Sequence, residues 1–136
     1  LLVKDLRFFI DFSEPETWEV INASGWHIYD PGAEIITEGE IDNSFYVVVS
    51  GEAEVRKGSQ TVDTLHPGDC FGEMGFISAG KERTASIVAT TALTAMKVRA
   101  SLIERASLQC QLRFHKVFLT TLVERLSHTT ARMSRA

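Results

Sequence analysis

The central part of the chain, residues 27–98, consists of short segments rich in β-branched and aromatic residues. The segments are IYD, EIIT, SFYVVVS, EAEVRK, QTVDTL, ASIVAT and TAMKV, and turn formers such as PG, EG, SG, KG and PGD stand between them. This pattern is typical of strands joined by tight turns. No long helical pattern separates the segments, which disfavours a doubly wound α/β sheet. The sequence therefore predicts an antiparallel β-roll, a jelly-roll-like barrel.

Helical patterns flank the predicted roll on both sides. Residues 1–26 begin with clustered apolar residues in LLVKDLRFFIDF, and two short helices fit this segment. Ser13 and Glu16 have the spacing of a capping box, and Pro15 lies in the first turn of the helix that TWEVINA would form. Residues 101–135 contain no Gly or Pro and predict C-terminal helices, one of them long. The predicted class is α+β, mainly β.

The long C-terminal helix has two apolar faces. One follows the three- and four-residue spacing of a coiled-coil seam and comprises Leu112, His115, Leu119, Leu122, Leu126, Thr129 and Met133. The other comprises Phe114, Val117, Phe118 and Val123. A helix with two such faces can pack on its own roll and on a partner at once, so we expect a homodimer through this helix. The alternative is that the seam also packs on the chain's own roll, as periodic apolar stripes usually do.

Length, composition and charge narrow the class of protein. With 136 residues, 44% of them hydrophobic, residues 1–136 are expected to form a single globular domain. The net charge of -4 argues against a nucleic-acid-binding surface. Cys70 and Cys110 are too few for a disulfide scaffold and no signal segment opens the chain, so a cytoplasmic location is expected. No apolar run approaches the ~20 residues that cross a bilayer, so no membrane association is expected.

The ends of the sequence suggest a larger protein. The chain begins without Met and stops within a helical pattern. We therefore expect a fragment of a longer chain, with an output domain that is either fused to it or separate.

Residues 71–86, FGEMGFISAGKERTAS, bring together glycines, a carboxylate and an arginine. Gly72 and Gly75 permit close approach of the backbone to a ligand, and free amides of a short helical turn there would face an anion. Arg83 has a planar fork suited to two phosphate oxygens. Glu73 would repel a phosphate and needs a donor, for which a ribose 2′-hydroxyl is suitable. A nucleotide whose phosphate bridges the 3′ and 5′ oxygens offers both groups.

These residues resemble the cyclic-nucleotide-binding domain family, which is shared by bacterial catabolite activators, cyclic-nucleotide-dependent protein kinases and gated channels. PGAEIITEGEIDNSFYVVVSGEAEV, LHPGDCFGEM and KERTASI follow the family's order and spacing, and the resemblance spans about residues 9–133. The phosphate-binding cassette, residues 71–85, is most similar to that of the catabolite activator protein. The resemblance implies a non-catalytic regulatory module that binds a 3′,5′-cyclic nucleotide and relays occupancy through its C-terminal helix.

The resemblance also implies roles for residues of the cassette. Gly72 would bring its amide to the ligand, Glu73 would accept a hydrogen bond from the ribose, and Arg83 would bind the phosphate. Thr84 would meet the phosphate as well, and Met74 belongs to the same ligand-binding segment.

Outside the cassette, the resemblance implies an apolar wall and a lid. Val55 and Val62 would form the wall near the sugar and base. Arg125, Thr129 and Thr130 of the C-terminal helix would close over the base, although both threonines also fit as tolerated seam residues. The winged helix-turn-helix that follows in the activators is absent from this sequence, so DNA binding by the chain is not expected.

The identity of the base stays open, because it depends on a few contacts. Thr84 would favour guanine, whereas the likeness to the activator cassette favours adenine. The sequence is therefore interpreted as a sensor of cAMP rather than cGMP.

Three other classes of protein are alternatives to this interpretation. Residues 75–82, GFISAGKE, nearly match the phosphate-binding loop of nucleotide triphosphatases, but Glu82 replaces the Ser or Thr that holds magnesium. A cupin-like metal enzyme needs clustered histidines, whereas these are scattered at His27, His66, His115 and His128. Neither catalytic residues nor a metal site can be assembled from the motifs. A dimerisation module with a non-functional pocket remains the main alternative.

Overall fold

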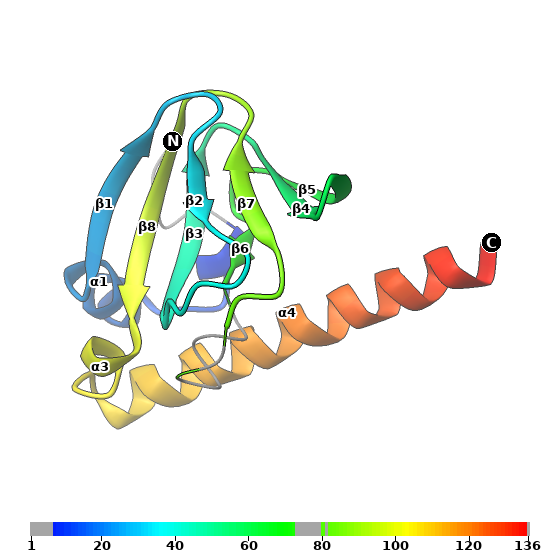
Figure 1. The fold of residues 1–136 in the computed structure, drawn as a ribbon. Helices are drawn as coiled ribbons and strands as arrows, with labels where there is room; N and C mark the ends of the chain where they lie inside the picture. The colour runs from blue at the N-terminus through cyan, green and yellow to red at the C-terminus, as the bar shows by residue number, and fades with distance from the viewer. Residues whose placement is uncertain (1–6, 73–79, 81, 136) are drawn as a thin grey trace.

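The computed structural model describes residues 7–72, 80 and 82–135, and this part of the chain forms a β-roll with helices packed at one end (Figure 1). Two antiparallel four-stranded sheets make the roll. One has the order β1 (Ser24–Tyr29), β8 (Leu93–Arg99), β3 (Ser44–Ser50), β6 (Cys70–Phe71). The other has the order β2 (Glu34–Ile36), β7 (Ser86–Ala89), β4 (Ala53–Lys57), β5 (Gln60–Leu65). The predicted β-roll is confirmed.

Helices precede and follow the roll. The 3-10 helix η2 (Arg7–Phe9) and α1 (Glu14–Asn22) come before it, and α3 (Ala100–Ile103) and α4 (Leu108–Arg135) come after it. The capping box at the start of α1 is confirmed: the Ser13 hydroxyl accepts from the Glu16 amide at 3.3 Å, and Glu16 Oε1 accepts from the Ser13 amide at 2.8 Å. Strand β1 begins at Ser24, three positions before the predicted start of the roll.

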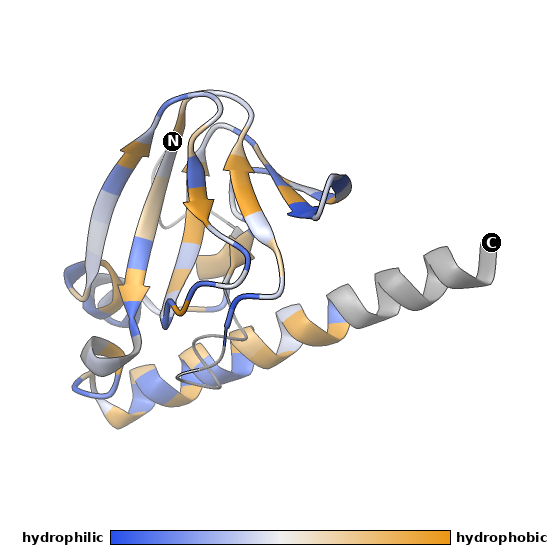
Figure 2. Ribbon diagram, viewed as in Figure 1, coloured by the Kyte–Doolittle hydropathy of each residue, from blue (hydrophilic) through white to orange (hydrophobic). Residues whose placement is uncertain are grey.

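A first core cluster lies between the helices and the sheet that contains β3. Phe45 of β3 is at its centre, with ring centroids 5.3 Å from Phe8, 5.4 Å from Phe114 and 5.0 Å from Phe118. Figure 2 shows apolar residues along β3 and along the first half of α4. These aromatic contacts attach the N-terminal segment and α4 to the same strand.

A second core cluster fills the inside of the roll. It contains Tyr46, Val48, Phe71 and Leu93, together with residues of the facing sheet such as Ile36 and Leu65. Because successive side chains of a strand point to opposite faces, Phe45 and Val47 enter the first cluster while Tyr46 and Val48 enter the second. The continuous apolar run of β3 is therefore explained by burial on both faces.

The two faces of α4 are only partly as predicted. Phe114 and Phe118 are buried and Val117 packs against the first core cluster, which confirms the roll-facing side. The assignment of Val123 to that side is wrong, because this side chain is 56% exposed. Leu122 was predicted in the seam, yet it packs against the first core cluster. The remaining exposed residues form an outward stripe on α4, defined as Leu108, Leu112, Leu119 and Val123.

Within the described residues, no helix is long and apolar enough to cross a membrane.

Replacing Phe114 by alanine should destabilise the fold strongly, because its fully buried ring contacts three other phenylalanines. We expect a loss of about 3–5 kcal/mol in the free energy of unfolding, measured by denaturant titration. Thr120→Ala on the same helix is the matched control, since Thr120 is exposed and lies off the outward stripe, and it should change stability by less than about 0.5 kcal/mol. Equal losses for the two variants would contradict the packing described for α4.

Candidate ligand site

Arg83 is held in place through its backbone by the turn that precedes β3. The Arg83 amide donates to the Glu40 carbonyl at 2.7 Å, and the Gly39 amide donates to the Arg83 carbonyl at 2.9 Å. Ile41 forms an isolated antiparallel bridge with Glu82. The end of the predicted cassette is therefore fixed to residues 39–41, far away in the sequence.

The guanidinium of Arg83 is buried and points at backbone oxygens. Nη1 donates to the Gly72 carbonyl at 2.9 Å, Nη2 donates to the Ser44 carbonyl at 2.7 Å, and Nη2 lies 3.8 Å from Asp42 Oδ1. Its Nε is buried and donates to no described group. A buried donor without an acceptor is unfavourable, so Nε is available to an oxygen supplied by a ligand.

Gly72 is required by two features of this arrangement. Its φ of +88° lies in the left-handed region, which side chains rarely adopt. A Cβ at this position would also lie 2.8 Å from the Ser44 carbonyl oxygen and 3.2 Å from Arg83 Nη2. Only glycine lets the chain after β6 pass this close to the arginine.

Asp42 and Tyr46 complete the surroundings of Arg83. Asp42 Oδ1 accepts from the Ser44 amide at 2.9 Å, and Oδ2 accepts from the Tyr46 hydroxyl at 2.8 Å. Burial alone would raise the pKa of Asp42, but these hydrogen bonds and the charges of Lys97 and Arg83 outweigh it and lower that pKa. The pKa of Tyr46 is raised, mainly by burial and next by its hydrogen bond to Asp42. A charged carboxylate and a neutral phenol therefore stand beside the guanidinium.

Sequence reasoning assigned no role to Asp42, Ser44 or Tyr46. The sequence did contain a signal for these residues, because the polar residues Asp42, Asn43 and Ser44 directly precede the apolar residues that begin with Phe45. The contacts of Asp42 and Ser44 with Arg83, about 40 positions later, could not be read from local patterns.

The other described site residues are Val55 on β4, Val62 on β5 and Thr84, which directly follows Arg83. Val55 is half-buried, packs against the second core cluster and pairs with Ile87 of β7, the strand that follows the cassette. Val62 on β5 is 40% exposed and Thr84 is exposed. The structure thus brings Gly72 and Arg83 into contact, while ligand contact by Val55, Val62 and Thr84 stays a prediction.

The remaining predicted residues cannot be placed as side chains. Glu73 and Met74 lie outside the described residues. Arg125, Thr129 and Thr130 belong to α4. The structure describes the backbone of these three residues but not their side chains. Figure 1 shows this end of α4 extending past the sheets.

The described groups have the chemistry of an anion-binding site. Arg83 is a buried cation whose Nε has no hydrogen-bond partner, next to a glycine that permits close backbone approach. Within residues 7–72, 80 and 82–135, no cluster of three His, Cys, Asp or Glu side chains could hold a metal ion. Nucleotide phosphate is an anion that suits such a donor.

Known proteins are similar to this chain in sequence and in structure. The cAMP-dependent protein kinase regulatory subunit of Yarrowia lipolytica is 37% identical over 93 residues, covering 67% of this chain and 24% of that protein. The cGMP-dependent protein kinase of Plasmodium berghei is 33% identical over 89 residues, covering 65% of this chain and 10% of that protein. The chain thus spans about a quarter or less of these relatives.

The catabolite activator protein of Thermus thermophilus has a similar solved structure. It superimposes with a TM-score of 0.77 and 25% identity, covering 94% of this chain and 62% of that one. This similarity agrees with the predicted likeness to the activators.

The sequence also matches a family model. Residues 26–109 match the cyclic nucleotide-binding domain, and this stretch includes both Gly72 and Arg83. Because the match covers more than half of the 136 residues, the chain belongs to the cyclic nucleotide-binding domain family.

Proposed function

We propose that this chain is a non-catalytic regulatory sensor that binds cAMP in preference to cGMP. The observation that carries the proposal is the buried guanidinium of Arg83, whose Nε lacks an acceptor among the described residues. Gly72, beside it, has a positive φ and contacts with Ser44 and Arg83 that only glycine allows. In this proposal the cyclic phosphate accepts from Arg83 and from the backbone that follows Gly72.

The contacts of Arg83 support a positioning role for Asp42. The carboxylate is fixed by the Ser44 amide and the Tyr46 hydroxyl, so it cannot swing away from the guanidinium. It lies 3.8 Å from Nη2, beyond hydrogen-bond distance. Asp42 therefore orients the arginine without using the donor proposed for the ligand.

The preference for cAMP rests on the likeness of the cassette to that of the catabolite activator protein. The relative with 37% identity is named for cAMP and the one with 33% for cGMP, so both nucleotides are represented among similar proteins. Thr84 is exposed and offers a hydroxyl that could contact a guanine. The competing contributions of the cassette and Thr84 make a direct comparison of the two nucleotides necessary.

Titration calorimetry with cAMP and cGMP tests the proposal. We expect tighter binding of cAMP, and we expect Arg83→Ala to weaken binding by at least ~2 kcal/mol because a desolvated, charge-assisted contact is lost. Arg83→Lys should restore only part of that loss, since the forked geometry is missing.

Lys57→Ala is the control for the Arg83 variants, because Lys57 is an exposed cation at the end of β4. Unfolding of each variant is measured in parallel, since Arg83 also supports the fold through Gly72 and Ser44. No binding of either nucleotide by the folded wild-type chain would favour the alternative of a dimerisation module with a non-functional pocket.

The proposed role of Glu73 is tested with 2′-deoxy-cAMP. If Glu73 accepts from the ribose 2′-hydroxyl, the deoxy ligand should bind more weakly than cAMP, and Glu73→Ala should narrow that difference. Affinities of both ligands for both proteins form one double-mutant cycle. Losses that simply add would show that Glu73 does not contact the hydroxyl.

We further propose that α4 relays occupancy through a homodimer. The outward stripe of Leu108, Leu112, Leu119 and Val123 lies on the side of α4 opposite to Phe114 and Phe118. Since α4 also carries Arg125, Thr129 and Thr130, one helix would contact both the ligand and a partner chain. A ligand that contacts one state of this helix better than another shifts its equilibrium by that difference.

Leu112→Glu combined with Leu119→Glu should convert the chain to a monomer and weaken cAMP binding. The introduced carboxylates of the two chains would face each other where the outward stripes meet, and they would repel. Light scattering gives the mass and calorimetry the affinity on the same samples. Thr120→Glu is the matched control, being exposed on α4 but off the stripe. A monomer with wild-type affinity would contradict the coupling of partner and ligand.

A further inference from the structure

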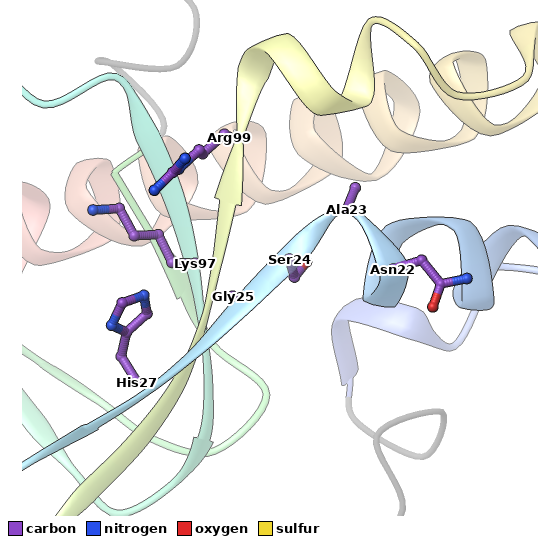
Figure 3. Close-up of a pocket in the computed structure, with 7 residues that line it drawn as sticks. All are labelled: Asn22, Ala23, Ser24, Gly25, His27, Lys97 and Arg99. Atoms are coloured by element: carbon purple, nitrogen blue, oxygen red, sulfur yellow. The ribbon is translucent and has the colours of Figure 1, made fainter.

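A pocket of about 260 Å³ lies where α1 leads into β1 and β8 leads into α3. It is lined by Asn22, Ala23, Ser24, Gly25, His27, Lys97 and Arg99 (Figure 3). The predicted nucleotide-binding residues are absent from this lining. The pocket is also smaller than the ~300–1,000 Å³ of typical ligand sites, so its occupant is a small group.

The strand register brings the nitrogen-bearing side chains of the pocket together. Gly25 and His27 are two positions apart on β1, and Lys97 and Arg99 are two positions apart on β8. The two residues of each pair therefore lie on the same face of their strand. Gly25 lies directly opposite Lys97. Figure 3 shows His27, Lys97 and Arg99 at one end of the pocket and Asn22 at the other.

Gly25 keeps this end of the pocket open. A Cβ on Gly25 would lie 3.3 Å from Nε2 of His27, which is tighter than ordinary contact. The His27 ring is also placed by Tyr29, on which it stacks with a centroid distance of 6.3 Å. The imidazole therefore has a defined position beside the space that the missing side chain leaves.

The cationic side chains of the pocket have no direct ion pair within the described part of the chain. No described carboxylate forms an ion pair with Lys97 or Arg99. The ammonium of Lys97 lies 5.7 Å from the centroid of the Tyr46 ring and is close enough to Asp42 to lower its pKa. Like charges held together repel each other, so a bound anion would stabilise this cluster. Such a cluster stands out in a chain whose net charge is -4.

We propose that this pocket binds the phosphate group of a small molecule, as a site separate from the cyclic-nucleotide site. Arg99 offers a fork for two phosphate oxygens, Lys97 a point charge and His27 a ring N–H donor. Three groups around one cavity suit the several oxygens and double charge of a phosphate monoester better than a single carboxylate. The source of the group is either free phosphate or a phosphorylated small molecule.

Amide chemical-shift titration by NMR tests this site residue by residue. Inorganic phosphate and glycerol 3-phosphate are added separately, with sodium chloride at matched ionic strength as the reference. We expect saturable shifts at Gly25, His27, Lys97 and Arg99. Tighter binding of glycerol 3-phosphate would identify a phosphorylated small molecule as the source, and equal binding would identify free phosphate. Shifts at Gly72 and Arg83 would report phosphate at the nucleotide site, so the two proposals fail independently.

Three variants separate a built site from general attraction by positive charge. Arg99→Gln and Lys97→Met should each weaken phosphate binding at least tenfold. Gly25→Ala should also weaken it, although it changes no charge, because its Cβ narrows the pocket next to His27. Lys57→Gln is the matched control and should bind phosphate as the wild type does.

Two results would overturn the proposal. One is an absence of saturable shifts at the pocket residues in the folded wild-type chain. The other is equal weakening by Lys57→Gln and Arg99→Gln, which would mean that phosphate responds only to the overall charge of the protein. Amide spectra of all variants establish that they are folded before the affinities are compared.

Discussion

The buried guanidinium of Arg83 determines how the chain is arranged at the ligand end of the roll. A cation taken out of water is unfavourable unless it is hydrogen-bonded and paired. The carbonyls of Ser44 and Gly72 accept from it at 2.7 and 2.9 Å, and the Asp42 carboxylate lies 3.8 Å away. These acceptors come from the turn before β3, from β3 itself and from the residue after β6. One side chain therefore fixes three segments relative to one another, and the positive φ of Gly72 is a consequence of that arrangement.

The polar site and the apolar interior of the roll share a residue. The Tyr46 hydroxyl donates to Asp42, while its ring stacks on Phe71 at a centroid distance of 4.9 Å and an interplanar angle of 3°. Phe71 directly precedes Gly72, so the stack also sets where the chain turns toward Arg83. Interiors are closely packed and transmit displacements. Changes in the second core cluster are therefore expected to move the acceptors of Arg83, even where the changed residue is far from any ligand.

Local patterns predicted the elements of this fold better than the contacts between them. The strands and the capping box of Ser13 follow from residue types at short spacing. Gly72 and Arg83 were singled out by residue type and by the family resemblance, but their direct contact was not predicted. Asp42 was missed because its contact with Arg83 joins positions 41 apart. Val123 was placed on the wrong side of α4, because apolar residues on both sides of a helix leave its rotation undetermined. Packing of Phe114 and Phe118 on Phe45 settles that rotation, and it also draws Leu122 toward the first core cluster.

Asp42 links the pocket at Lys97 to the environment of Arg83. The charges of both Lys97 and Arg83 lower the pKa of this carboxyl group, so both cations interact with one carboxylate. An anion next to Lys97 would repel the Asp42 carboxylate and offset part of the effect of Lys97 on its pKa. A phosphate at Arg83 would act on this carboxyl group in the same direction. Coupling between two binding sites is reciprocal, so each anion changes the binding affinity of the other by the same factor. Two bound anions would also repel each other directly, so each would weaken the binding of the other even without movement of the chain.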